Sequence, residues 1–498
     1  MENIEKKLTS NMSVKKATII NGAGRYVNIL FSLGVNVVLS RLLTPEEYGI
    51  VAVVTIFTTF FSLFADMGFG SAYIENRELT KEDRDSLFSF MCYVGFGLFL
   101  LFFGIAYFIA WFYKSDVYIY ISWLLGFNLF LTAVKAIPLS DLQKQFKFAT
   151  VSIVQIISSV VSSGIAVLMA FYGCSYYSIV AQSIIYTFVN LVVFEVLTKC
   201  KFKFKLDVSV LKKTYKFATG QLGFNCINYF SRNLDNILIS SILGETSLAY
   251  YDKAYKTSTY PVSNFASIIG GSIHPVLAQQ QNNKLLVYDQ FKKAFLFLFA
   301  IGCYASFALY LTSRETILVL YGDQWEQSIF PFSMLALSLA FQMSLNITGA
   351  FYQTLNKTHL LAIEGIISTA IIVTGIGIGV SFNSISSVAI GYLIAETVNF
   401  IQGLFVLSKF LFKRSFKDIV IHVFKLICCT LCSFIICYFT FKYLPFENIY
   451  GLFAFKISFS LIVYFVFLFI FREDKLILSV FKKKPVVTSK SKIEENKR

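Results

Sequence analysis

Apolar runs of about 20 residues follow one another along this chain from Ala17 to Phe471. A helix of that length crosses the hydrocarbon core of a bilayer, whereas a soluble core has no need of such runs in series. Hydrophobic residues make up 56% of the 498 residues and charged residues only 15%, which is the composition of a membrane protein. We therefore predict an all-α polytopic membrane protein.

The number of runs and the positions of the basic residues together predict the topology. A window of about 20 residues gives about fourteen spans, an even number that leaves both termini on one side. With the N-terminus inside, the inner segments hold 34 of the 44 lysines and arginines, and the outer segments hold four. The positive-inside rule then places both termini in the cytoplasm. Because this topology accounts for the net charge of +15, we expect no nucleic-acid partner.

A polar stripe occurs twice within the apolar runs, and each residue of the second copy follows its counterpart by 200 positions. The two copies are Asn21, Arg25, Asn28, Ser32, Asn36 and Gln221, Asn225, Asn228, Arg232, Asn236. Spacings of four, three, four and four residues place each copy on one face of a helix. A guanidinium at membrane depth is costly unless it lines water, protein or a ligand. The two faces therefore predict a polar cavity.

The stripe belongs to a longer internal repeat. At the same offset, 39-LSRLL-43 corresponds to 239-ISSIL-243, and each copy contains six predicted spans, so both halves have the same orientation. We predict two parallel six-helix lobes around a central cavity, followed by a C-terminal helix pair. The predicted divisions are 1–200 for spans 1–6, 201–408 for spans 7–12, and 409–498 for spans 13–14 with a basic cytoplasmic tail.

The two arginines of the stripe lie at different depths. Arg25 is about eight residues from the cytoplasmic end of its span, or roughly 12 Å, and Arg232 is about sixteen residues in, or roughly 24 Å. Cations at two depths would pass an anion outward in steps. Asp235 lies one turn from Arg232, so the alternative is that these two charges only neutralise each other. The predicted cavity residues are Asn21, Arg25, Asn28, Asn225, Asn228, Arg232, Asp235 and Lys253.

Other charged residues in the predicted spans carry weaker signals. Asp66, Glu364 and Glu396 are candidates for coupling to a H⁺ or Na⁺ gradient, with structural hydrogen bonding as an equal alternative. Lys253 lies near the outer end of the eighth span, where an interfacial ion pair explains it as well as a cavity role. The nine cysteines are scattered through apolar segments and the chain has three histidines, so we expect no metal site and no cofactor.

Several stretches resemble a known family. They are 40-SRLLTPEEYGIVAV-53, 66-DMGFGSA-72, 228-NYFSRNLDNILIS-240 and 244-GETSLAYYDKAYKTSTYPVSNFASIIGGSIHPVLAQQQ-281. They are similar to Wzx-type flippases of O-antigen, capsule or exopolysaccharide repeat units, which belong to the multidrug/oligosaccharidyl-lipid/polysaccharide exporter superfamily. The resemblance covers the first twelve predicted spans, while the last two match only in hydropathy.

The resemblance implies a function. A flippase of this kind sits in the bacterial plasma (inner) membrane and moves undecaprenyl-pyrophosphate-linked oligosaccharide repeat units from the inner to the outer leaflet by alternating access. Its implied partners are the lipid-linked oligosaccharide and membrane lipids, with a polysaccharide polymerase and assembly proteins as candidate protein partners. Arginine suits such a substrate because its planar fork donates two parallel hydrogen bonds to phosphate.

Two other functions compete with this interpretation. A MATE-like exporter of small cationic compounds would want carboxylates to dominate the cavity, whereas the stripe carries arginines. A polytopic glycan polymerase or transferase would need a sizeable extramembrane loop or a carboxylate cluster. The largest predicted outer loop, from Arg314 to Glu326, has only about 13 residues, so we expect a transporter and not an enzyme.

Overall fold

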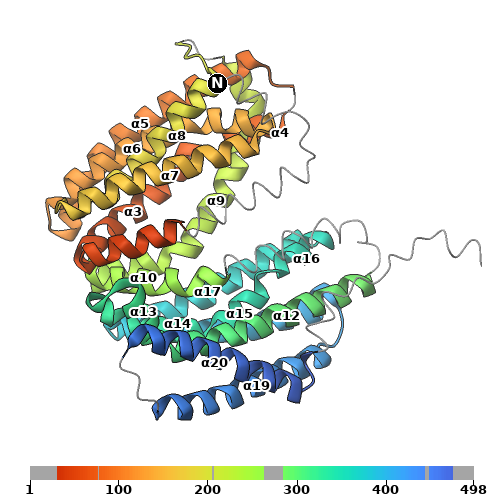
Figure 1. Cartoon of the computed structure of the whole chain (residues 1–498). Helices are drawn as coiled ribbons and strands as arrows, with labels where there is room; N and C mark the ends of the chain where they lie inside the picture. The colour runs from red at the N-terminus through yellow and green to blue at the C-terminus, as the bar shows by residue number, and fades with distance from the viewer. Residues whose placement is uncertain (1–30, 77, 205–206, 263–283, 444–447, 475–498) are drawn as a thin grey trace, which may run out of the picture. The chain divides into compact units, whose positions relative to one another are not determined.

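The computed structural model describes residues 31–76, 78–204, 207–262, 284–443 and 448–474. In these ranges every regular element is a helix (Figure 1). Ten of the described helices are long and apolar enough to cross a membrane, and the bent pair Asp323–Leu337 and Leu339–Thr354 makes an eleventh candidate. The predicted class, an all-α polytopic membrane protein, is therefore confirmed.

The eleven candidates correspond to eleven of the roughly fourteen predicted spans. The predicted span 16–41 is described only from residue 31, within the helix Phe31–Leu42. The predicted span 216–243 lies in α9 (Val208–Leu243), where the polar stripe lowers the hydropathy, and the span at 247–275 is described as far as residue 262. The full count of fourteen stays a prediction.

The contacts within the chain divide it into two compact units. Unit 1 comprises residues 1–250 with 320–325, and unit 2 comprises residues 251–319 with 326–498. The predicted divisions at 1–200, 201–408 and 409–498 follow the sequence repeat and not the contacts. They stay a prediction.

Unit 1 is a bundle of long helices. In chain order they are Phe31–Leu42, α3 (Pro45–Asp66), α4 (Phe69–Glu75), α5 (Lys81–Tyr113), α6 (Val117–Lys144), α7 (Phe148–Phe171), α8 (Tyr177–Thr198) and α9. The helix α6 packs against α3, α5 and α8, and α9 packs against α3 and α5. The helices α3 and α6 therefore form the centre of this unit.

Capping residues define where two of these helices begin. Thr44 accepts a hydrogen bond from the backbone N–H of Glu47, whose carboxylate in turn accepts one from the N–H of Thr44. Thr80 and Asp83 make the same capping box at the start of α5.

The helix α3 ends at Asp66 because Met67 and Gly68 adopt left-handed conformations, with φ of 44° and 70°. The helical path is therefore interrupted between α3 and α4 within 66-DMGFGSA-72.

A buried ion cluster joins the ends of four helices in unit 1. The Arg84 guanidinium of α5 donates to the carboxylates of Asp85 and, on α6, Asp141, at 2.7 and 3.0 Å. It also donates to the carbonyl of Thr198 at the end of α8, at 3.1 Å. The Tyr73 hydroxyl of α4 donates to Asp141 at 3.0 Å. Separating these partners would leave a buried charge without compensation, which is strongly destabilising. The cluster therefore holds these helix ends in place relative to one another.

The segment that follows α8 is held along α5. The backbone N–H of Lys203 donates to the Ser89 hydroxyl at 2.7 Å, and the N–H of Asp207 donates to the Ser86 hydroxyl at 3.0 Å. The connection into α9 therefore begins as part of unit 1.

Unit 2 is built around α12 (Lys284–Leu311). It further contains α14 (Ile329–Leu337), α15 (Leu339–Leu345), α16 (Thr348–Thr354), α17 (Thr358–Ser381), α18 (Ile385–Val406), η3 (Leu407–Phe412), α19 (Lys417–Lys442) and α20 (Ile449–Ile470). The short elements α10 (Glu245–Pro261), α13 (Ser313–Tyr321) and η2 (Asp323–Ser328) cross the boundaries between the units.

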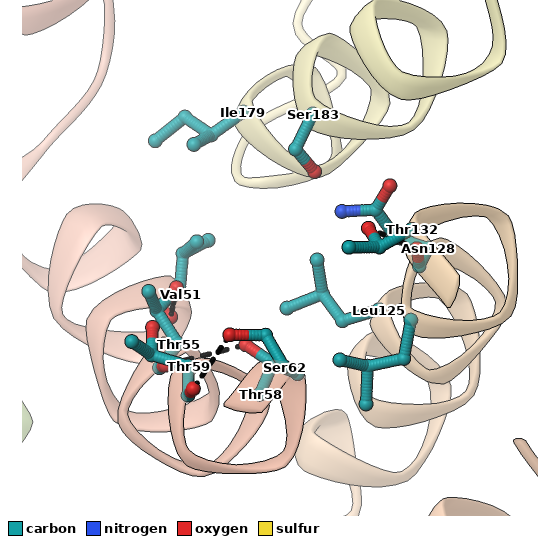
Figure 2. Close-up of a pocket in the computed structure, with 11 residues that line it drawn as sticks. Val51, Thr55, Thr58, Thr59, Ser62, Leu125, Asn128, Thr132, Ile179 and Ser183 are labelled. Atoms are coloured by element: carbon teal, nitrogen blue, oxygen red, sulfur yellow. Dashed lines mark hydrogen bonds between the residues drawn. The ribbon is translucent and has the colours of Figure 1, made fainter. Parts of the chain in front are cut away.

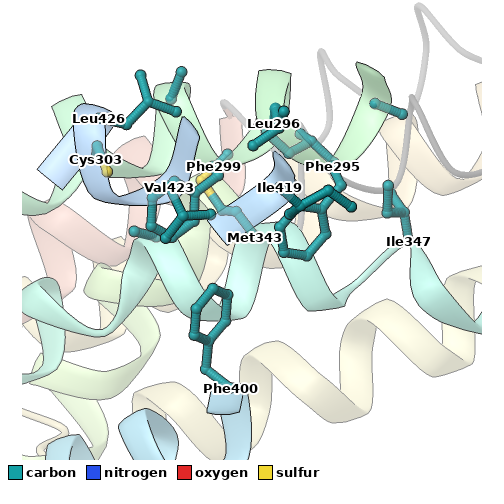
Figure 3. Close-up of a cluster of buried hydrophobic side chains, with 14 of the residues drawn as sticks. Phe295, Leu296, Phe299, Cys303, Met343, Ile347, Phe400, Ile419, Val423 and Leu426 are labelled. Atoms are coloured by element: carbon teal, nitrogen blue, oxygen red, sulfur yellow. The ribbon is translucent and has the colours of Figure 1, made fainter. Parts of the chain in front are cut away.

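The core of unit 2 is aromatic and contains the C-terminal helix pair. Phe295 and Phe299 of α12 contact Phe400 of α18, while Ile419 and Val423 of α19 close the same cluster (Figure 3). Polar contacts add to this packing. Lys456 of α20 forms an ion pair with Glu315 of α13 at 2.6 Å, and a ring nitrogen of His422 of α19 lies 2.8 Å from the carboxylate of the buried Glu473. The pair α19–α20 is thus an integral part of unit 2.

The helices α17 and α18 touch through their backbones. A Cβ placed on Gly375 would lie 2.6 Å from the carbonyl oxygen of Gly391 and 2.6 Å from the Cβ of Ala395. A Cβ on Gly379 would lie 2.7 Å from the backbone of Val388. Small residues allow such close packing in membranes, where van der Waals contact is a main source of helix association.

This contact predicts a position-specific effect of added volume. Gly375→Leu should destabilise the protein by about 1–3 kcal/mol, because the side chain has no space between α17 and α18. The matched control is Gly377→Leu on the same helix, where an added Cβ meets no atom within 4 Å. Thermal unfolding of the purified proteins in detergent measures both, and equal midpoints for the two variants would contradict the packing described.

Candidate functional site

The first copy of the polar stripe falls mostly outside the described residues. Asn21, Arg25 and Asn28 lie there, and their predicted roles stay predictions. Ser32 and Asn36 lie on the helix Phe31–Leu42, as the spacing predicts.

The second copy lies entirely on α9, so its helical spacing is confirmed. Asn225 and Asn236 are half-buried, and Asp235 is buried, with one carboxylate oxygen accepting a hydrogen bond from the backbone N–H of Asn236 at 2.8 Å. The side chains of Gln221, Asn228 and Arg232 lie outside the described residues. The predicted pairing of Arg232 with Asp235 therefore stays a prediction.

A polar pocket of about 230 Å³ lies inside unit 1 between α3, α6 and α8. Its polar lining consists of Thr55, Thr58, Thr59, Ser62, Asn128, Thr132 and Ser183. Figure 2 shows the side chains of α3 facing Asn128 and Thr132 of α6 and Ser183 of α8 across a shared space. A cavity of this size and polarity accommodates several water molecules or part of a polar ligand.

The hydroxyl groups of the pocket leave acceptor lone pairs for a ligand. Thr55 donates to the carbonyl of Val51 at 2.7 Å, and Ser62 donates to that of Thr59 at 2.7 Å. Thr132 and Ser183 likewise donate within their own helices, each at 2.8 Å. Because each hydroxyl proton is used by the backbone, the oxygens present acceptors to the pocket. The Oδ1 atom of Asn128 is buried and has no hydrogen-bond partner among the described residues.

The charged residues and the polar stripe do not predict this pocket, although the sequence contains a signal for it. Thr55, Thr58, Thr59 and Ser62 have spacings of three, one and three, which place them on one face of an apolar helix. Asp66 follows Thr55 by 11 residues and continues the same face, where its side chain is exposed. Asp66 is conspicuous because it is charged. The neutral hydroxyl groups that precede it on the same face of α3 are not.

The two other candidate carboxylates are buried in unit 2. Glu396 of α18 accepts a hydrogen bond from the Tyr392 hydroxyl at 3.1 Å and one from the Asn399 side-chain amide at 3.5 Å. Glu364 of α17 faces α18, because its Oε1 lies 3.7 Å from the point that a Cβ on Gly403 would occupy. Within the described residues neither carboxylate has a basic partner within 4 Å.

Lys253 lies on α10 and is buried. Its neighbour Lys256 pairs with Asp252 at 2.6 Å. An ion pair is therefore present on this helix between Lys256 and Asp252. Whether Lys253 lines a cavity stays a prediction.

Comparison with known protein families identifies this architecture. Residues 38–330 match the model of a family described as polysaccharide biosynthesis proteins. The chain belongs to this polysaccharide biosynthesis family. The match covers the helices that carry the pocket, the second stripe and α10.

Curated relatives of this polysaccharide biosynthesis protein are bacterial. It is 23% identical over 380 residues to the teichuronic acid biosynthesis protein TuaB of Bacillus subtilis, covering 74% of this chain and 77% of that protein. It is 19% identical over 431 residues to the lipopolysaccharide biosynthesis protein WzxC of Escherichia coli, covering 83% and 85% of the two chains. The resemblance to Wzx-type flippases is confirmed.

Solved structures show the same fold. The lipid II flippase MurJ in an inward closed conformation superposes with a TM-score of 0.73 at 15% identity, covering 92% of this chain and all of that one. An inward-facing MATE multidrug transporter of the same exporter superfamily has a TM-score of 0.56 at 15% identity, covering 76% and 94%. The protein is a multi-pass membrane transporter of polysaccharide biosynthesis, and its family is not one of enzymes.

The pocket in this polysaccharide biosynthesis protein should contain water. Ser183→Cys places a thiol in the pocket, and we expect a membrane-impermeant maleimide to label it above the background of the nine native cysteines. The matched control is Ser158→Cys on α7, because Ser158 is fully buried and does not line the pocket. Equal labelling rates in the two variants, measured by mass spectrometry, would mean that the pocket is dry.

Proposed function

We propose that this protein moves oligosaccharide repeat units linked to undecaprenyl pyrophosphate from the inner to the outer leaflet by alternating access. The observation that carries the proposal is the polar pocket of unit 1, which lies among membrane-spanning helices of a polysaccharide transporter. Its neutral amide and hydroxyl groups have the chemistry that sugar hydroxyl groups require.

The physical problem that such a protein solves is the passage of a polar head group. The polyprenyl tail can remain in lipid, but the pyrophosphate and glycan need hydrogen bonds that hydrocarbon does not offer. Arg25 and Arg232 would bind the pyrophosphate at an inner and an outer station. Asn21, Asn28, Asn225, Asn228 and Lys253 would contact the remaining head group. A polysaccharide polymerase and assembly proteins would receive the product on the outer side.

A small-molecule exporter is the second candidate, since the fold is shared with a MATE multidrug transporter. A cationic drug is best held by carboxylates, and none of the residues that line the pocket is acidic. The proposal for a lipid-linked sugar is therefore the better supported of the two. It includes a topology with both termini in the cytoplasm, for which the distribution of basic residues is the support.

The direct test is the leaflet on which the lipid-linked repeat units accumulate. Depletion of the protein should trap them on the inner leaflet, where they resist a membrane-impermeant oxidant of sugars added to intact spheroplasts. Complementation with Arg25→Ala or Arg232→Ala should lower export roughly tenfold to hundredfold, since hydrogen bonds to charged groups contribute about 1.5–3 kcal/mol. Surface polysaccharide and the oxidant-resistant fraction are the two measurements.

Conservative variants separate binding from folding. Arg25→Lys and Arg232→Lys keep the charge but lose the paired donors, so we expect partial export at normal protein levels. Normal surface polysaccharide from both alanine variants would refute the role of the arginines. Absence of inner-leaflet accumulation on depletion, together with new sensitivity to cationic compounds, would favour the small-molecule exporter.

We further propose that Glu364 and Glu396, with Asp66 as a third candidate, couple transport to a H⁺ or Na⁺ gradient. The support is the burial of both glutamates without a basic partner within 4 Å in the described chain. A buried carboxyl group of this kind is expected to be protonated or to bind a cation.

Neutral variants test the coupling. In sealed vesicles, transport by the wild-type protein should respond to an imposed H⁺ or Na⁺ gradient, and the response should be lost in Glu364→Gln or Glu396→Gln. The control is Glu326→Gln, because this side chain is largely exposed and pairs with the equally exposed Arg314. If both buried variants keep the full gradient response, the glutamates serve a structural role.

A further inference from the structure

A second cavity of unit 1 lies on the opposite face of α3 from the polar pocket. It is a groove of about 420 Å³ between α3, α5 and α9. Its walls include Phe57, Phe60, Phe61, Ile105, Phe108 and Ile237. On α3, Thr55, Thr59 and Ser62 face the pocket while the three phenylalanines face the groove, so one helix separates a polar space from an apolar one.

The hydroxyl groups at the rim of the groove form hydrogen bonds within the protein. The Tyr229 hydroxyl donates to the backbone carbonyl of Ile56 at 2.5 Å. The Tyr113 hydroxyl donates to the Ser240 hydroxyl at 2.9 Å, and Ser240 donates to the carbonyl of Ile237 at 3.1 Å. The groove therefore presents hydrocarbon and aromatic ring faces. Its occupant must be an apolar chain, and its volume lies in the range of about 300–1,000 Å³ that small-molecule sites have.

The groove adjoins the polar stripe on α9. At 100° per residue, Tyr229, Ile237 and Ser240 fall on one face of the helix, and the stripe from Gln221 to Asn236 falls on a face roughly a quarter turn away. A molecule that places a charged head at the stripe can therefore place an attached apolar chain in the groove. This continuity between a polar and an apolar face points to an amphiphile.

The groove lies toward one end of the spans. Its residues lie in the last third of α5, in the second half of α9 and at the middle of the candidate span Pro45–Glu75, which runs in the opposite direction. With the N-terminus inside, this is the half of unit 1 that faces the outer leaflet. The groove would thus hold an apolar chain after its head group has moved outward.

We propose that this groove binds the polyprenyl chain of the lipid-linked substrate at the outer-leaflet stage of transport, which rests on the function proposed above. Methyl branches and double bonds make a polyprenyl chain broader and stiffer than a saturated acyl chain. The rings of Phe60, Phe61 and Tyr229 meet at centroid distances of 5.3 to 5.4 Å and form a wide wall on which such branches pack. A phospholipid acyl chain is the competing occupant.

Photocrosslinking distinguishes the two occupants. A benzoylphenylalanine replaces Phe108, which lines the groove, or Tyr107, which does not; these neighbours are 55% and 53% exposed and lie at the same depth. The full-length protein sits in nanodiscs of saturated phosphatidylglycerol containing undecaprenyl phosphate as the probe. We expect several-fold more polyprenyl adduct at position 108 than at 107. Equal polyprenyl adducts at both positions, or phospholipid adducts alone at 108, would overturn the proposal.

A transport measurement supplies the second test. Ile105→Trp narrows the groove, and Tyr107→Trp changes the same helix outside it. We expect the first variant, at normal protein level, to lower surface polysaccharide several-fold and the second to leave it unchanged. If depletion traps repeat units inside while Ile105→Trp exports normally and the adducts are equal, the groove proposal fails and the proposed function stands. If depletion traps nothing, the function itself fails.

Discussion

The hydrocarbon of a bilayer offers no hydrogen bonds, so each polar group within a span must find its partner in the protein. The hydroxyl groups of Thr55, Thr58 and Ser62 on α3 meet this requirement by donating to carbonyls of their own helix. Arg84 meets it with two carboxylates and a helix end. In the polar pocket, acceptor capacity remains on the hydroxyl oxygens and on the Oδ1 atom of Asn128, which has no hydrogen-bond partner among the described residues.

The sequence predicted the membrane-spanning helices well because length and apolarity are properties of a continuous segment. It also predicted the helical face of the second stripe, since the spacing from Gln221 to Asn236 is local. The ion cluster of Arg84 and Asp141 was not predictable, because the two residues are 57 positions apart and only the packing of α5 on α6 brings them together.

The polar pocket illustrates a different limit. Hydroxyl groups change hydropathy little, and threonine occurs in many membrane helices because it bonds its own backbone. The four residues on α3 become a site only when Asn128, Thr132 and Ser183 arrive from two other helices. A charged residue at membrane depth can be recognised from the sequence by itself. A site made of neutral groups can be recognised only after folding has brought those groups together.

The backbone contact between α17 and α18 has a mechanical consequence. Where Gly375 and Gly391 meet, the backbones of the two helices are in direct contact and no side chain lies between them. Neither helix can therefore rotate about its axis or slide along the other without separating the two backbones. The two helices therefore move together as one rigid body. Glu364 belongs to α17 and Glu396 to α18. A movement of either helix therefore displaces both glutamates together.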